Sequence, residues 1–268
     1  METQVSYLEL AYWQVALATL LILFNGALSF ALDLGLGRRL LIAAARTTVQ
    51  LLLVGFVLQW VFALNHWGPV MGLALFMVRV AGFAAVRRSS RRFPGIWVSS
   101  TLSILVSSFV VAGIALTAIV RVEPWYLPQY AIPFLGMILG NALTGISLGL
   151  DRFSETLVRG RDEVELYLTL GGTRWEAALP AIREAVRTGM IPILNSMTVV
   201  GLVSLPGMMT GQLLAGVPPS EAVKYQIVIM FVIASVTGLG TVGAVLMSYR
   251  RLFNHRHQFL ADTISEAR

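Results

Sequence analysis

The residues of this 268-residue chain that could do chemistry are uncharged polar side chains set within long apolar runs. Asn141 and Thr144 lie in one such run, and Asn195 and Thr198 lie in a later one. An unpaired amide or hydroxyl that faces hydrocarbon costs free energy, so these groups are expected to meet one another, water or a transported solute. The pattern therefore predicts a polar pathway along these four residues.

Close helix packing is the alternative interpretation of the same region. Gly136 and Gly140 are four residues apart, and Gly145 continues a stripe of small residues. Such spacing lets helix backbones approach one another closely in lipid. The sequence leaves both interpretations open.

A segment broken by prolines and glycines, residues 206–224, carries further candidate ligands. Met208 and Met209 offer thioether sulfurs, which are soft metal ligands, although methionine also fills gaps in apolar cores. Thr210 and Gln212 add polar groups, which we expect at the outer mouth of the pathway. Cysteine is absent and the three histidines are assigned no metal, so the metal ligands stay unknown.

Two arginines inside apolar runs give a different option. Arg46 and Arg79 could each reach the inner membrane surface by snorkelling. Gln50 is one turn from Arg46 on the same helical face, so these two residues could also contact an anionic substrate. No Asp or Glu occurs in the interior of any apolar run, which weighs against a relay of carboxylates and against a hard metal ion.

The elements that must position these residues are membrane-spanning helices. Hydrophobic residues make up 56% of the chain and charged residues 13%, which is too little polar surface for a soluble domain. A helix needs about 20 residues to cross hydrocarbon, and the expected fold is an all-α, polytopic integral membrane protein with about seven transmembrane helices. The apolar runs are residues 7–31, 40–64, 67–86, 97–120, 130–150, 188–205 and 225–249.

The basic residues predict the orientation of these helices. Of the 20 lysines and arginines, 16 fall in alternate connections and in the C-terminal tail. Because cytoplasmic loops carry the excess of Lys and Arg, the N-terminus is expected outside and the C-terminus in the cytoplasm. Residues 151–187 are then cytoplasmic, and residues 206–224 are external. The net charge of +6 reports this topology, so the expected partner is the lipid bilayer and no nucleic acid.

The long polar interruption at residues 151–187 carries two helix-start signatures. Asp162 with Glu165, and Thr173 with Glu176, each place a capping side chain three residues before a carboxylate. A pair of glycines between them is expected to end the first helix. A helix, a glycine break and a helix are too small for a catalytic domain, and they suit a docking element for another protein.

Three stretches of the sequence carry a resemblance to a known family. They are LDLGLGRRLLIAAARTTVQLLLVG, PFLGMILGNALTGISLGL and GLVSLPGMMTGQLLAGVPP, in which PGMMTGQ and GMxxGN are the most specific elements. Together they resemble the FetB-type permeases, the membrane subunits of iron-export ABC transporters, which are related to plant permeases of aluminium tolerance. The resemblance covers nearly the whole chain.

The resemblance implies a single transmembrane permease domain over residues 1–268 that exports a metal ion such as iron across the inner (plasma) membrane. The chain contains no GxxxxGK[ST] phosphate loop. We therefore expect that it does not hydrolyse ATP, that it is not an enzyme and that it binds no cofactor itself. ATP is then used by a separate ABC ATPase (nucleotide-binding) subunit. A second copy of the chain is expected to complete a homodimer.

Residues 165–175 are expected to contact that ATPase subunit. Their sequence resembles the EAA loop of bacterial import permeases, in that Glu165 precedes Gly171 by six residues. Leu168 and Trp175 would be apolar anchors in a groove of the ATPase, and Glu165 and Arg174 would set the register. The alternative is an amphipathic helix that lies on the lipid surface without a protein partner.

Two other functions stay open. A stand-alone secondary transporter or channel would need no ATPase, although no clear internal repeat supports that class. An ABC permease for an anionic or sugar-nucleotide substrate would use Arg46 and Arg79 as contacts.

Overall fold

The computed structural model describes residues 11–266, which divide into two units. The hairpin unit holds the described residues as far as Asn65, together with Gln212–Val217. The bundle unit holds His66–Gly211 and the described residues from Pro218 onward. The single permease domain expected over residues 1–268 stays a prediction.

The hairpin unit consists mainly of two helices, α1 (Tyr12–Ala31) and α2 (Gly37–Leu64), which pack against each other. The connection between them turns through Gly35, where φ is 65°. It is held by the Ser29 hydroxyl, which accepts a hydrogen bond from the Leu36 backbone N–H at 3.0 Å. Most apolar side chains of both helices are exposed, as expected for helices that face lipid.

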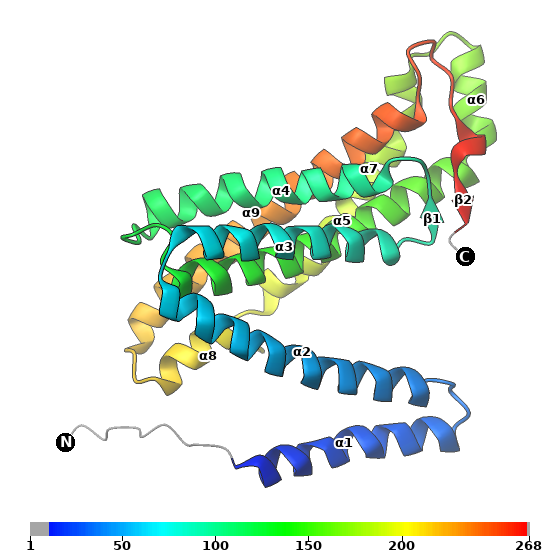
Figure 1. Ribbon diagram of the computed structural model, residues 1–268. Helices are drawn as coiled ribbons and strands as arrows, with labels where there is room; N and C mark the ends of the chain where they lie inside the picture. The colour runs from blue at the N-terminus through cyan, green and yellow to red at the C-terminus, as the bar shows by residue number, and fades with distance from the viewer. Residues whose placement is uncertain (1–10, 267–268) are drawn as a thin grey trace. The chain divides into compact units, whose positions relative to one another are not determined.

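The bundle unit packs four long helices around a fifth, α5 (Figure 1). Helix α5 contacts α3, α4, α7 and α9, and α4 runs on into the π-helical turn η1. The long elements are α3 (Trp67–Arg87), α4 (Ile96–Ile114) with η1 (Ala115–Ile119), α5 (Pro128–Arg159), α7 (Arg174–Val199) and α9 (Pro219–Leu252). The short ones are β1 (Arg91–Arg92), α6 (Arg161–Thr169), α8 (Gly207–Leu214), η2 (Ala261–Thr263) and β2 (Ser265–Glu266).

The core of the bundle unit follows one stripe of α5. Ile146, Leu150, Phe153 and Leu157 recur at intervals of four and three residues, and all are fully buried against α7 and α9. Next to this stripe the helices come so close that a Cβ added at Gly189 of α7 would lie 2.6 Å from the Gly145 carbonyl oxygen of α5. The small residues around Gly145 therefore serve helix packing.

The other two glycines of the small stripe lie in looser surroundings. A Cβ added at Gly140 would meet nothing within 4 Å, and one at Gly136 would meet only the Met77 side chain at 3.6 Å. The spacing of Gly136 and Gly140 predicts close backbone approach at those two residues. The structure has the close approach at Gly145 instead, about one helical turn after Gly140.

Six helices in the described part of the chain are long and apolar enough to cross a membrane. They are Trp13–Ala31, Gly37–Leu64, Trp67–Arg87, Ile96–Ile119, Pro128–Arg159 and Pro219–Leu252. The expected run at residues 188–205 is not among them, because α7 carries charged residues in its first half and ends at Val199. Its apolar part therefore covers only about 18 Å at 1.5 Å per residue. The all-α, polytopic fold is confirmed, and the seventh span stays a prediction.

The C-terminal tail folds back onto the bundle unit. Strand β2 pairs antiparallel with β1, which lies in the connection between α3 and α4. Arg161 of α6 donates a hydrogen bond to Asp262 at 3.3 Å, and the Arg174 backbone N–H donates to Nδ1 of His257 at 2.9 Å. Three segments that the charge pattern assigns to one side of the membrane thus contact one another.

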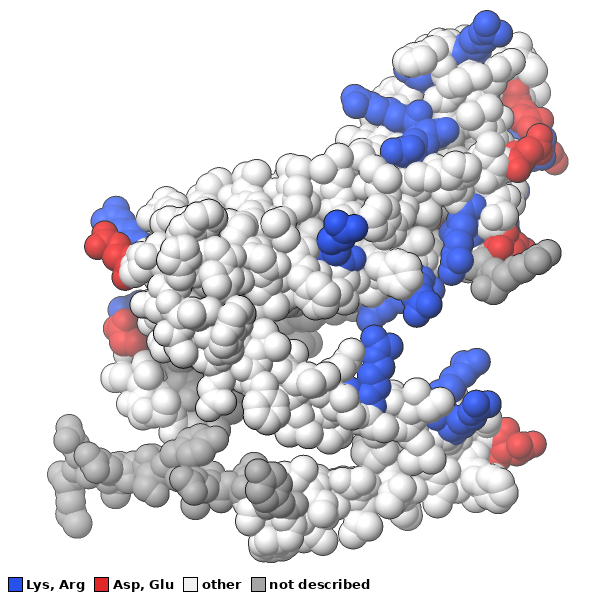
Figure 2. Space-filling model, in the orientation of Figure 1, with Lys and Arg blue, Asp and Glu red and all other residues white. Residues whose placement is uncertain are grey.

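Charged side chains gather at this end of the bundle unit, where α6 and the tail lie (Figure 2). A further contact there ties the connection between α3 and α4 to α5. The backbone N–H and the hydroxyl of Ser90 both donate to Oδ1 of Asp151 at 2.7 Å. This end of the bundle unit is therefore polar, whereas its long sides are largely apolar.

Candidate functional site

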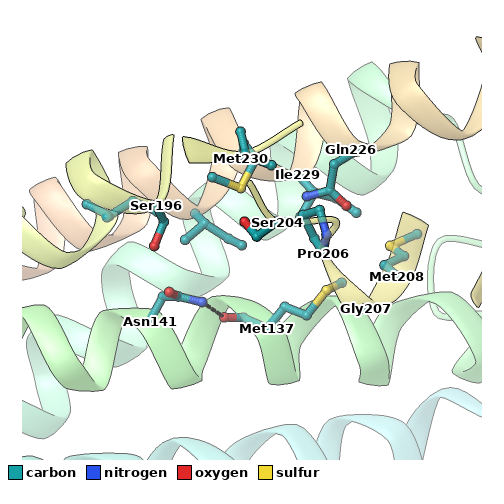
Figure 3. A pocket seen from close by; sticks show the side chains of 13 residues that line it. Met137, Asn141, Ser196, Ser204, Pro206, Gly207, Met208, Gln226, Ile229 and Met230 are labelled. Atoms are coloured by element: carbon teal, nitrogen blue, oxygen red, sulfur yellow. Dashed lines mark hydrogen bonds between the residues drawn. The ribbon is translucent and has the colours of Figure 1, made fainter. Parts of the chain in front are cut away.

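A pocket of about 310 Å³ lies within the bundle unit between α5, α7, α9 and the chain that follows α7. Asn141, Ser196, Ser204 and Gln226 supply its polar side chains (Figure 3). The sulfur-bearing side chains of its lining are Met137, Met208 and Met230. None of the residues that line the pocket carries a charge.

The wall after α7 is built by a turn. Gly201 takes the left-handed conformation with φ of 82°, and its N–H donates to the Ser204 carbonyl oxygen at 2.9 Å. Glycine suits this position because a side chain there would be strained. Pro206 then directly precedes α8, which brings Met208 to the pocket.

Two side-chain amides line the pocket, and they differ in their hydrogen bonding. The Asn141 side-chain amide donates to the Met137 carbonyl oxygen, one turn back on α5, at 2.9 Å (Figure 3). Gln226 of α9 is only 6% exposed, and its side-chain oxygen has no hydrogen-bond partner among the described residues. A buried amide oxygen without a partner is unfavourable unless a ligand or water completes it.

Gln226 was not predicted from the sequence. The signal that could have identified it is an amide side chain inside the last apolar run, four residues before Met230 and so on the same face of the helix.

The structure brings together two of the predicted pathway residues, Asn141 and Met208. Thr144 lies on α5 outside the lining, and its hydroxyl donates to the Gly140 carbonyl oxygen at 3.1 Å. Asn195 and Thr198 are exposed on α7, where Ser196 lines the pocket instead. The pathway along all four predicted polar residues stays a prediction.

Three other candidates lie on α8 outside the pocket lining. Met209 and Gln212 are half-buried, and the Thr210 hydroxyl donates to the Pro206 carbonyl oxygen at 3.1 Å. Arg46 and Gln50 lie exposed on α2 of the hairpin unit. Among the residues that the structure describes, no group of three or more His, Cys, Asp or Glu side chains could hold a metal ion.

The predicted docking segment forms α6 and the start of α7. The prediction that Asp162 caps the first helix is wrong: α6 begins at Arg161 after Gly160, and Arg161 donates to Glu165 at 2.6 Å. The prediction of a glycine break is confirmed, because Gly171 has φ of 90° and directly follows Leu170, the residue that caps the end of α6. The second capping box, formed by Thr173 with the residue three positions later, is also confirmed.

Helix α6 turns one apolar side inward and another outward. Val164 is buried and Leu168 packs against the core of the bundle unit. Leu166, Tyr167 and Leu170 remain 59%, 53% and 78% exposed. These three residues, named here the α6 apolar patch, are exposed, whereas Leu168 faces inward.

Trp175 and Arg174 contact the end of α9 and the tail. The Trp175 ring is 44% exposed and meets Tyr249 edge-on, with ring centroids 5.5 Å apart. The Arg174 guanidinium donates to the Asn254 carbonyl oxygen at 3.0 Å. The indole therefore keeps an exposed surface, while Arg174 already binds the tail.

Two carboxylates on the polar half of α7 have lowered pKa values. The Thr173 backbone N–H and hydroxyl each donate to Glu176 at 2.8 Å, and these bonds hold the pKa of that carboxyl below its usual value. Arg152 of α5 donates from Nε to Glu184 at 2.9 Å, and this hydrogen bond lowers the pKa of Glu184. Both carboxylates are ionised at neutral pH, where one caps α7 and the other ties α7 to α5.

Comparison with known proteins shows that the chain matches one protein family. The family described as "Uncharacterised protein family (UPF0014)" matches residues 12–253. The UPF0014 membrane protein slr1647 of Synechocystis is 41% identical over 231 residues, which are 85% of this chain and 88% of that protein. The "Probable iron export permease protein FetB" of Escherichia coli is 32% identical over 255 residues, 94% of this chain and 96% of that protein.

A plant protein matches along nearly the same length. The protein ALUMINUM SENSITIVE 3 of Arabidopsis thaliana is 31% identical over 250 residues, which are 93% of this chain and 90% of that protein. No solved structure matches the chain.

Proposed function

Because this chain belongs to the UPF0014 family of membrane proteins, we propose that it is the membrane-spanning permease subunit of an ABC transporter that exports a metal ion such as iron. ATP would be bound and hydrolysed by a separate subunit, with two copies of each subunit in the inner membrane. The E. coli relative named as a probable iron export permease supports this proposal. A pocket that no charged residue lines fits a cation better than an anionic substrate, which would call for basic contacts.

The observation that carries the proposal is the α6 apolar patch. Leu166, Tyr167 and Leu170 are exposed, and charged side chains gather at the end of the bundle unit where α6 lies (Figure 2). Apolar side chains clustered on a polar surface mark a protein interaction site. The patch lies on the segment that the charge pattern places in the cytoplasm, on the same side as a cytoplasmic ATPase.

The helix that carries the patch also contacts the core of the bundle unit and the C-terminal tail. Helix α6 is fixed to the core by Val164 and Leu168 and to the tail by the bond between Arg161 and Asp262. Helix α7 starts directly after the glycine break and ends at the pocket. An ATPase bound to the patch could therefore bias the pocket through α7, and cargo in the pocket could bias the ATPase by reciprocal coupling.

The proposal is tested by affinity purification of the full chain from its native membranes, followed by measurement of ATPase activity with and without iron. We expect an ATP-binding protein to be retained. The substitution Leu170→Ala should weaken that association by at least about tenfold, as expected for an apolar interface anchor. Trp175→Ala should lower iron-stimulated ATPase activity while membrane insertion stays intact.

Leu202→Ala is the matched control. Leu202 is 88% exposed, and it follows the opposite end of α7 from the patch. Its replacement should leave ATPase binding unchanged. Iron transport by the purified chain alone, with no ATP-binding protein retained, would instead identify a secondary transporter or channel.

A further inference from the structure

The pocket between α5, α7 and α9 combines three thioethers with a buried amide. We propose that it binds a soft cation of low charge, of the class of Cu(I) and Ag(I). The ligands are the sulfurs of Met137, Met208 and Met230 and the side-chain oxygen of Gln226. This inference rests on the proposed function, because it takes the pocket as an ion site of that permease, and it names a soft cation instead of iron as the ion bound there.

The three methionines reach the pocket from three separate elements, α5, α8 and α9 (Figure 3). Met230 is 9% exposed, whereas Met137 and Met208 are half-buried. A methionine whose role is to fill space leaves no room beside it, yet a volume of about 310 Å³ remains between these side chains. They line the space instead of filling it, which leaves room for a ligand beside their side chains.

Gln226 supplies the second, independent observation. Its side chain is 94% buried, lines the same pocket, and presents an oxygen with no hydrogen-bond partner among the described residues. Burial of such an oxygen is unfavourable, and a cation in the pocket would offset that cost by direct coordination.

The neutral lining selects the class of cation. Hard multivalent ions bind carboxylate and other oxygen ligands, and the lining holds no Asp or Glu. Thioether sulfur is a soft ligand that favours ions such as Cu(I). An ion with a single positive charge also needs no anionic side chain beside it to be neutralised, so uncharged sulfur and amide donors match it best.

The test uses the purified full chain in lipid nanodiscs, without ATP or a partner subunit. Ag(I), which resists oxidation, is titrated in competition with a chromophoric chelator. Met208→Leu and Met230→Leu remove the sulfur at nearly constant volume, so the fold should survive both changes. Each substitution should weaken Ag(I) binding by at least tenfold. Gln226→Leu should also weaken it.

Met209→Leu is the matched control, because Met209 is the neighbour of Met208 in α8 and does not line the pocket. It should leave Ag(I) affinity unchanged. X-ray absorption of the Cu(I)-loaded protein should show sulfur around the metal, and that signal should be lost in the double variant Met208→Leu and Met230→Leu. Ag(I) affinity that is equal in the wild type and in both single variants would overturn the proposal.

ATPase activity with iron and retention of an ATP-binding protein separate this inference from the proposed function. Iron-stimulated ATPase activity together with no methionine-dependent Ag(I) site would overturn the soft-cation assignment and leave the ABC permease standing. A methionine-dependent Ag(I) site in a chain that retains no ATP-binding protein would support the site and overturn the ABC assignment.

Discussion

The close approach of Gly189 of α7 to Gly145 of α5 predicts that one methyl group added at Gly189 lowers the stability of the protein. In Gly189→Ala the new Cβ would lie 2.6 Å from the Gly145 carbonyl oxygen and 2.7 Å from Cγ2 of Thr241. Real Cβ atoms essentially never come within 3.0 Å of another heavy atom, so the carbonyl would have to retreat by at least 0.4 Å. Because that oxygen belongs to the backbone, α5 and α7 would have to move apart.

The expected cost follows from two opposing effects. Overpacking of a well-packed core costs about 1–3 kcal/mol, while alanine is favoured over glycine inside a helix by about 1 kcal/mol. The difference between these two effects is a net destabilisation of up to about 2 kcal/mol. At about 2–4 °C per kcal/mol for a protein of this size, the unfolding midpoint should fall by up to about 8 °C.

The assay is thermal denaturation of the purified protein in detergent. The fraction of protein that remains monodisperse is measured at each temperature. Gly140→Ala is the matched control, because a Cβ there meets nothing within 4 Å and the substitution keeps only the gain in helix propensity. Its midpoint should stay unchanged or rise. Equal midpoints for Gly189→Ala and Gly140→Ala would refute the close approach of the two helices.

Three further predictions concern topology, cargo and pH. Single cysteines placed at Thr173 and Ser220 of the cysteine-free chain should react from opposite sides of the membrane, the first from the cytoplasm; reaction of both from outside would overturn the orientation. Asn141→Ala should reduce metal transport while Arg46→Gln leaves it intact, and the reverse result in transport assays would indicate an anionic substrate. Because the fold holds the pKa of Glu176 below its ordinary 4.5, the capping box stabilises the protein fully above that pH and loses this contribution as the pH falls through the lowered value. The thermal midpoint of the wild type should therefore drop more on acidification below about pH 4.5 than that of Glu176→Gln, and identical profiles would contradict this role of the capping box.

In the predicted docking segment, residues 151–187, the sequence predicts those helix ends that depend on only a few neighbouring residues. The capping box at Thr173 needs only the carboxylate three residues later, and the break before it needs only a glycine that tolerates the left-handed conformation at Gly171. The start of α6 lies two residues before the predicted one, because Gly160 caps both the end of α5 and the start of α6, and Asp162 therefore falls inside the first turn.

The membership of the candidate site could be predicted only in part. Asn141 and Met208 line the pocket, as expected of pathway residues, but Asn195 lies exposed on α7 and Gln226 takes a place in the lining. Leu168 faces the core, and its neighbours form the exposed patch of α6. Each of these outcomes depends on how a helix is rotated about its own axis, which a run of similar residues does not specify.

The sequence by itself determined that the chain is all-α and membrane-embedded, because the length and apolarity of a run decide whether it can cross hydrocarbon. It also determined the family, through motifs such as PGMMTGQ that are read along the chain. Only the tertiary structure decided which polar and sulfur-bearing side chains converge between α5, α7 and α9. The reason is that lipid is as apolar as the interior of a helical bundle, so the hydrophobic pattern that places a helix in the membrane does not tell its lipid-facing side from its core-facing side.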